Sequence, residues 1–230
     1  MSERYALYFA PDVASPLWQR ASQWLGRDCA GGAVTERPAE IEGIALDPIT
    51  KSARHYGFHA TLKAPMMLAG NVDRAELETA LTGFARAAQP VDIGRLVVAQ
   101  ISHFLALIPE KQSTALTDFA AECVTAFDRF RAPMTAAQRE QRLSGGLSPR
   151  QIALVDQYGY PYVLEEFRFH MTLTDRLKAE DSAPVKAAAE AWFGDAIAAP
   201  VPLDRIVLFH QPVAGADFVR LGDYVLGRKD

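Results

Sequence analysis

Two short segments of the chain repeat the same histidine motif. Residues 58–62 read Phe-His-Ala-Thr-Leu and residues 169–173 read Phe-His-Met-Thr-Leu, so the copies match at four of five positions and lie 111 residues apart. An imidazole has an ordinary pKa of about 6.5, so near neutral pH one member of a pair can accept a proton while the other donates one. A single strand histidine is usually structural, but the duplication favours acid–base catalysis or ligand binding by His59 and His170.

Each copy also places a hydroxyl two residues after its histidine. Both copies lie in short apolar stretches that predict strands, in which side chains alternate between faces. Thr61 and Thr172 should therefore point the same way as the histidines and can donate hydrogen bonds to non-bridging phosphate oxygens. The same alternation puts Lys63 and Arg168 on these faces, either as positive charge for a phosphate or as solvated strand-end charges. If the two halves pack about a pseudo-twofold axis, the polar faces meet in one cleft.

Other catalytic arrangements have little support in the sequence. Neither motif is His-x-His, and no nearby cysteine or carboxylate completes a ligand set at a familiar spacing, so we expect no metal and no cofactor. Gly-x-Ser-x-Gly is absent, which argues against a serine nucleophile. Gly145-Gly146 lacks the Gly-Lys-Ser/Thr of a phosphate-binding loop. Two alternatives stay open: a module that binds a nucleotide or phosphosugar without turning it over, and an enzyme that ligates or hydrolyses RNA ends.

Several other polar and aromatic residues are weaker candidates. His103 shares a strand face with leucines, so we expect it in the core, and His55 fits an exposed loop better than the entrance of a cleft. Gln211 follows a strong strand and can either bond a substrate or cap a turn. Tyr56 and Tyr160, which precede the two motifs, are candidates to contact a substrate, although core packing is the commoner role of such rings.

The elements around the motifs mix strands and helices without strict alternation, which favours an α+β fold with largely antiparallel pairing. Strands are predicted over residues 4–9, 57–63, 91–100, 103–108, 168–174, 203–209 and 218–226. Helices are predicted over residues 16–25, 73–88, 113–130 and 182–193, with two more beginning near 135 and 149. Residues 27–55 read as a long loop. No linker separates two domains, so we expect a single domain over residues 1–230, made of two lobes.

The composition excludes several classes of protein. The 230 residues are 49% hydrophobic and 23% charged, a mixture typical of globular proteins rather than disordered ones. Lys and Arg number 24 and Asp and Glu 28, for a formal charge of −4, which suits a small phosphorylated substrate better than a long nucleic acid. Cys29 and Cys123 read as reduced thiols of a cytoplasmic protein. We expect no signal peptide and no membrane partner, and the oligomeric state stays open.

At the two histidine motifs the chain resembles the two-histidine (2H) phosphoesterase superfamily, whose signature is a pair of His-x-Thr/Ser-x motifs, one in each lobe. The resemblance implies a bilobal, pseudo-twofold α+β fold, with mostly antiparallel sheets around a central cleft and with flanking helices. It also implies hydrolysis of cyclic phosphates or 2′,5′ linkages in nucleotides and RNA ends, generally without metal. His59 and His170 would then act as general acid and base, and Thr61 and Thr172 would hold the phosphoryl oxygens.

Longer strings around the motifs are similar to one branch of this superfamily, which is found beside bacterial phosphonate-utilisation genes. The strings are Tyr56–Pro65, Gly159–Val163 and Phe167–Thr174. The branch implies cleavage of a small sugar cyclic phosphate or phosphodiester that arises in phosphonate breakdown, with ribose cyclic phosphates as natural candidates. The sequence leaves open which histidine is the acid and which bond of the ring opens.

Overall fold

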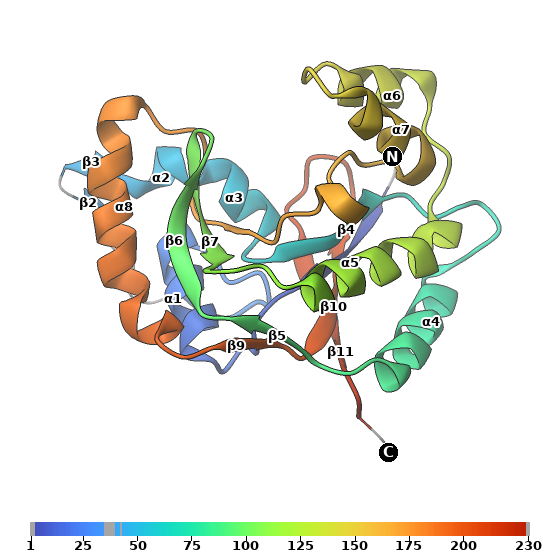
Figure 1. Ribbon diagram of the computed structural model, residues 1–230, viewed down its shortest axis with the longest axis horizontal. Helices are drawn as coiled ribbons and strands as arrows, with labels where there is room; N and C mark the ends of the chain where they lie inside the picture. The colour runs from blue at the N-terminus through green and yellow to red at the C-terminus, as the bar shows by residue number, and fades with distance from the viewer. Residues whose placement is uncertain (1–2, 35–39, 42, 229–230) are drawn as a thin grey trace.

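The computed structural model describes residues 3–34, 40–41 and 43–228, which form one large sheet with helices around it (Figure 1). The strands are β1 (Arg4–Phe9), β2 (Glu40–Ile41), β3 (Ile44–Ala45), β4 (Ala60–Met66), β5 (Val91–Gly94), β6 (Leu96–Ile101), β7 (Phe104–Pro109), β8 (Met171–Thr172), β9 (Val201–Leu203), β10 (Arg205–Gln211) and β11 (Val219–Val225). The α-helices are α1 (Pro16–Leu25), α2 (Leu46–Ile49), α3 (Lys51–Tyr56), α4 (Arg74–Ala87), α5 (Thr114–Phe127), α6 (Ala136–Leu143), α7 (Pro149–Tyr158) and α8 (Ala179–Phe193). Short 3₁₀ turns are η1 (Asp128–Phe130), η2 (Leu164–Glu166) and η3 (Gly194–Ile197).

Seven strands form the main sheet in the order β11-β10-β1-β4-β8-β7-β6. Each neighbouring pair in this sheet is antiparallel, which confirms the predicted α+β fold with antiparallel pairing. The small pairs β2-β3 and β5-β9 lie outside the main sheet. The motif strands β4 and β8 are direct neighbours in the middle of the order, so the two copies of the motif meet there.

A local twofold axis relates the two copies of the motif. Strands β4 and β8 pair antiparallel at Ala60 and Met171, which are equivalent residues because each directly follows the histidine of its copy. Extending this register by one residue in either direction puts each histidine across from the threonine of the other copy. Because i and i+2 share a face of a strand, both His/Thr pairs lie on one face of the sheet.

A β-bulge interrupts β4 at the last residue of the first motif, Leu62. Tyr8 of β1 pairs with Thr61, but Leu7 pairs with Lys63, so β4 has one residue more than β1 between these positions. An extra residue in one strand re-aims the side chains that follow it. As a result Ala64 follows Thr61 along the wall of the cavity described below, and Lys63 turns to the opposite face, toward α5.

Three of the helices that cover the sheet or stand beside it, α4, α5 and α7, begin at side-chain caps. Asp73, Ser113 and Ser148 each accept a hydrogen bond from a backbone N–H in the first turn of α4, α5 and α7, which satisfies donors that the helix itself leaves open. Helix α5 packs against β4, α4 against β10 and β11, and α8 against β6 and β7. The hairpin of α6 and α7 stands out from this body beside the N-terminus (Figure 1).

The segment 27–55 is more ordered than a long loop. Its described residues include α2, α3 and the pair β2-β3, while residues 35–39 and 42 lie outside the described part. Helix α3 begins where the Asp175 carboxylate accepts hydrogen bonds from the N–H groups of Ser52 and Ala53, at 2.8 and 3.1 Å. A residue more than a hundred positions away thus supplies this cap, so no local signal reveals it.

The second motif strand is shorter than predicted, and the first begins and ends three residues later than predicted, over 60–66 instead of 57–63. Instead of 168–174, β8 covers two residues, because side chains replace its neighbouring ladder bonds: Gln112 Oε1 accepts from the N–H of Phe169 at 2.8 Å and Thr174 Oγ1 from that of Leu105 at 2.9 Å. Strand β4 continues past Pro65. Its only pairing with β8 is at its first residue, so a proline near the far end breaks no bond to that strand. Among the described residues, no helix has the length and apolar character needed to cross a membrane.

Candidate active site

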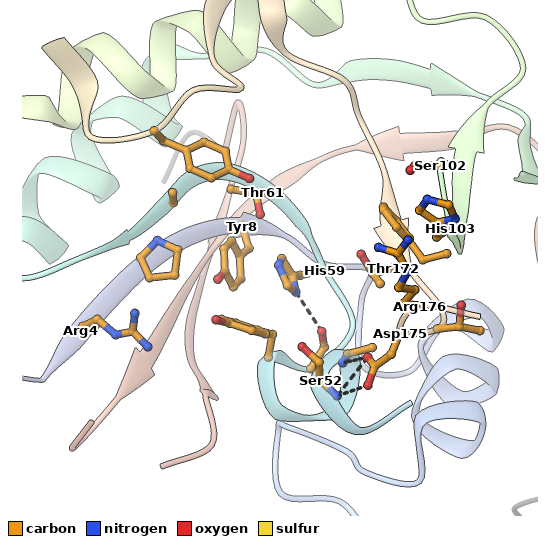
Figure 2. A pocket seen from close by; sticks show the side chains of 18 of the residues that line it. Arg4, Tyr8, Ser52, His59, Thr61, Ser102, His103, Thr172, Asp175 and Arg176 are labelled. Atoms are coloured by element: carbon orange, nitrogen blue, oxygen red, sulfur yellow. Dashed lines mark hydrogen bonds between the residues drawn. The ribbon is translucent and has the colours of Figure 1, made fainter. Parts of the chain in front are cut away.

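A cavity of about 680 Å³ lies over the polar face of the motif strands. Its wall includes His59, Thr61 and Thr172 from the motifs, together with Tyr8 from β1. Figure 2 shows the His59 imidazole between the Tyr8 ring and Thr172. Small-molecule sites have volumes of about 300–1,000 Å³, so this cavity has the size of a site for a metabolite or a nucleotide.

His59 is packed into the cavity wall. Its ring stacks on Tyr8, with the ring centroids 3.7 Å apart and the planes at 18°. Its Nδ1 lies 2.8 Å from the carbonyl oxygen of Gly57, so Nδ1–H donates and Nε2 is the ring nitrogen left for a ligand. Burial lowers the pKa of His59 from 6.5 to about 4, an effect that the Gly57 bond opposes and the charge of His170 reinforces. His59 is therefore a neutral acceptor at neutral pH.

His170 repeats this arrangement in a more open place. Its Nδ1 lies 2.8 Å from the carbonyl oxygen of Arg168. Arg168 precedes His170 by two residues, just as Gly57 precedes His59 by two residues. The imidazole is half-buried and does not itself line the cavity. It lies beside Phe104, which does line the cavity, with the two ring centroids 6.0 Å apart. The equivalent bonds set the same tautomer in both histidines, whereas their surroundings differ.

The cavity is cationic although the protein as a whole is acidic. Arg4, Arg142 and Arg176 line it. Among the residues that the structure describes, the one acidic residue in its wall is Asp175, and the carboxylate of Asp175 is already bonded to the first N–H groups of α3. Low-dielectric walls that carry one sign of charge concentrate a ligand of the opposite sign, so the cavity is suited to an anion.

Lys63 does not reach the cavity, contrary to the expectation from strand alternation. The bulge turns it toward α5, where its Nζ donates to the carbonyl of Val124 at 3.2 Å and to the carboxylate of Asp128 at 2.9 Å. Burial lowers the pKa of Lys63, and the bond to Asp128 raises it. The side chain is almost completely buried, so it is neither a ligand for a phosphate nor a solvated strand-end charge.

Arg168 and Gln211, both proposed to contact substrate, also lie outside the cavity wall. Arg168 is exposed and donates to two nearby backbone carbonyls at 3.0 and 2.8 Å. Gln211 is fully buried; its Oε1 accepts from Arg4 Nε at 2.6 Å and its Nε2 donates to the Ala216 carbonyl at 2.7 Å. Gln211 therefore positions a cavity arginine and does not itself face the cavity.

Tyr56 and Tyr160 both line the cavity, as a role in substrate binding requires.

His103 also lines the cavity. The expectation that His103 belongs to the core is wrong, because it is exposed in the turn between β6 and β7. Ser102 adopts a φ of 54° there, which ends the strand, so the alternation with the leucines does not extend to His103. No glycine or proline marks this turn in the sequence, so the usual turn signal is missing. His55 lies on α3 and contacts the Asp217 carboxylate at 2.9 Å.

Other reactive groups have no place in this cavity. Within residues 3–34, 40–41 and 43–228, no cluster of three or more His, Cys, Asp or Glu side chains is arranged to hold a metal ion. Cys29 and Cys123 are free and buried. Burial raises the pKa of the Cys29 thiol to about 11 and raises that of Cys123 as well, so neither is a ready thiolate nucleophile.

Comparisons with known proteins give the chain its relatives. A family model described as "Protein of unknown function (DUF1045)" matches residues 61–219. The chain is 39% identical over 223 residues to a protein of Janthinobacterium sp. (strain Marseille), and 36% identical over 215 residues to one of Laribacter hongkongensis (strain HLHK9), both named ribose 1,5-bisphosphate phosphokinase PhnN. These matches cover 94% of this chain and 49% and 50% of the relatives, so the chain spans about half their length.

Among solved structures, E. coli LigT complexed with 3′-AMP is similar, with 12% identity and a TM-score of 0.44. The match covers 99% of this chain and 100% of that chain.

Proposed function

The chain belongs to the DUF1045 family, and we propose that it is a metal-independent phosphoesterase that hydrolyses a small cyclic phosphate or phosphodiester. The observation that carries this proposal is the local twofold arrangement of the motifs. Two imidazoles with the same fixed tautomer and two threonines meet on one face of the sheet, beside a cationic cavity. Hydrolysis at phosphorus needs one proton acceptor, one proton donor and stabilised oxygens, and this arrangement can supply all three.

In the proposed reaction the two histidines have different roles. His59 is neutral because of its burial, so its Nε2 accepts a proton from the attacking water as the oxygen–phosphorus bond forms. His170 lies in a more open position and in its protonated form gives the Nε2 proton to the leaving oxygen as the ester bond breaks. The hydroxyls of Thr61 and Thr172 donate to the non-bridging oxygens. After release of the product, a proton passes from His59 to solvent and one from solvent to His170.

The substrate class is a small phosphorylated sugar or nucleoside. The cationic cavity favours an anion. Its volume can hold molecules up to about the size of a nucleotide. The relatives named ribose 1,5-bisphosphate phosphokinase PhnN support a ribose phosphate, in the setting of phosphonate breakdown. A ribose cyclic phosphate is therefore the first substrate to test.

The test is phosphorus NMR with EDTA present. The panel holds 2′,3′-cyclic nucleotides, ribose 1,2-cyclic phosphates and phosphonate esters, each with wild type, His59→Asn, His170→Asn and the double variant. We expect each single variant to lose about 10²–10⁴-fold in turnover. The double variant should lose little more, because residues that act as a unit are not additive. His210→Asn is the matched control, since its ring lies outside the cavity, against Tyr5 and Glu3.

Three outcomes would contradict the proposal. Full activity in both single variants would remove the histidines from the reaction. Turnover that EDTA abolishes and a divalent cation restores would show that a metal takes part. A cyclic phosphate that raises the Tm of the protein and stays intact would favour a module that binds without turnover.

A further inference from the structure

A second cavity adjoins the first and shares part of its wall. It has a volume of about 510 Å³ and extends along the α6–α7 hairpin. Five residues line both cavities: Arg4, Tyr56, Pro65, Arg142 and Tyr160. The two cavities therefore form one continuous cleft, and the arginines stand at the junction, away from the histidine pair.

Neither junction arginine is neutralised by the part of the chain that the structure describes. Arg4 donates from Nε to Gln211, and its guanidinium lies 5.4 Å from the centroid of the Phe218 ring. The Arg142 guanidinium lies 5.4 Å from the centroid of Tyr160. Arg131, in the wall of the second cavity, differs in this respect, because it is bound to Asp128 at 2.8 Å. Unpaired guanidinium edges in a concave wall are typical of sites for phosphate or carboxylate.

The fold holds both arginines in place. The buried Gln211 is fixed by a backbone carbonyl and presents its Oε1 to Arg4 Nε, which leaves the two terminal nitrogens of Arg4 for another acceptor. Arg142 lies on α6, three residues after Arg139, and Arg139 ties this helix to α7 through Asp156 at 2.6 Å. A rigid mounting of this kind lowers the entropy that ligand binding has to overcome.

The junction lies too far from the histidines for one phosphate to occupy both places. Arg4 and Tyr8 are on the same strand, four residues apart, so their Cα atoms are separated by about 13 Å. Tyr8 stacks on His59, and Figure 2 shows Arg4 on the side of Tyr8 away from His59. A sugar or nucleoside with phosphates at two positions spans such a separation.

We infer that Arg4 and Arg142 form a second phosphate subsite, and that the substrate carries a phosphomonoester in addition to the ester that is cleaved. The inference deepens the proposed function, because it places the scissile phosphate at the histidines. Tyr56 and Tyr160, which line both cavities, flank the part of the substrate between the two phosphates. Gln211 is a positioning residue that acts through Arg4.

The experiment measures binding rather than turnover, so it does not depend on catalysis. Isothermal calorimetry compares ribulose 1,5-bisphosphate with ribulose 5-phosphate, and adenosine 2′,5′-bisphosphate with adenosine 2′-monophosphate. In at least one pair we expect wild type to bind the bisphosphate about 10–100-fold more tightly, as two charge-assisted contacts to arginine would give. Arg4→Gln and Arg142→Gln should each reduce this ratio about tenfold.

A matched control separates the subsite from general charge. Arg20 is exposed, lies 4.8 Å from the centroid of Trp192 and lines neither cavity, so Arg20→Gln removes one charge and one ring contact elsewhere. The ratio should stay at the wild-type value in that variant. Helix α6 buries no side chain in the core, so Arg142→Gln stays folded even if Arg4→Gln does not.

The inference is wrong if neither bisphosphate binds more tightly than the matching monophosphate, or if this advantage survives in the folded arginine variants. Tighter bisphosphate binding without any turnover would keep the subsite and reject the proposed catalysis.

Discussion

The imidazole of His59 lies almost parallel to the phenol ring of Tyr8, with centroids 3.7 Å apart. Tyr8 is buried and comes from β1, the strand next to the first motif strand. One face of the imidazole is thereby shielded from water, and burial is the main cause of its lowered pKa. Both histidines are half-buried as whole residues, but the Nδ1 contact of His59 is part-buried and that of His170 is exposed. The two copies of the motif therefore have the same internal geometry and a different local exposure.

Removing the ring of Tyr8 should raise the pKa of His59. In Tyr8→Leu we expect the value to move from about 4 toward the ordinary 6.5 by roughly one unit or more, because water reaches the imidazole. A pH titration of the histidine signals by NMR measures this shift. Tyr8→Phe keeps the stacked ring and should keep the wild-type pKa. Equal pKa values in Tyr8→Leu and wild type would mean that the stack does not shield His59.

The stability of the protein should fall between pH 7.5 and pH 5 through His59. Its pKa is about 4 when folded and about 6.5 when unfolded, so between these values the unfolded state binds more protons and acid favours it. The contribution is fully present above about pH 6.5 and has lost about 2 kcal/mol by pH 5. Urea unfolding at both pH values should show a smaller loss for His59→Asn than for wild type. His170→Asn still contains the His59 imidazole, so its free energy of unfolding should fall about as much as that of wild type. An equal loss in all three proteins would mean that His59 is not the group responsible.

Lys63 should matter for stability and not for activity. Asp128→Ala leaves the buried Lys63 ammonium without its carboxylate, and we expect a loss of about 2–3 kcal/mol in the free energy of unfolding. Lys63→Met fills the same space without a charge and should cost less, about 1 kcal/mol. Once a substrate is known, Lys63→Met should retain its kcat/KM. A folded Lys63→Met protein that loses more than about tenfold in kcat/KM would return this lysine to the site.

Gly57 should tolerate no side chain. It has a φ of 78°, and a Cβ there would lie 2.5 Å from Cys29 Sγ. Both effects destabilise Gly57→Ala, which we expect to cost about 3 kcal/mol and to displace the carbonyl that orients His59. Cys29→Ala alone should cost about 1 kcal/mol. In the double variant the lost Sγ should restore about 1 kcal/mol, while the strain in φ and the contact with the Cβ of residue 29, at 2.9 Å, remain. Urea unfolding of the four proteins gives the coupling energy, and a value near zero would exclude the Sγ contact as a cause.

The faces of the motif strands could be predicted from the sequence, because a period of two places His59 and Thr61 on one side. The rule failed at Lys63, two residues later, because a bulge depends on the pairing between β4 and β1 and leaves no mark in the pattern of β4 alone. It failed at His103 because the strand ends in a turn without glycine or proline.

The other features of the site that the sequence does not predict depend on contacts between distant parts of the chain. Gln211 bonds Arg4 across 207 positions of sequence, and the Asp175 carboxylate begins α3 from 123 positions away. Neither residue carries a local signal for these roles. The second cavity likewise depends on where the α6–α7 hairpin packs, which helix periodicity does not determine.

The twofold axis between Ala60 and Met171 has a consequence for the direction of the proposed proton relay. An axis of symmetry has no direction, since it makes its two sides interchangeable, whereas a relay must begin at one nitrogen and end at the other. Duplication alone would supply two equal half-sites. The shielding of one imidazole by Tyr8, and the openness of the other, give the pair a polarity, so that a symmetric scaffold can orient an asymmetric substrate.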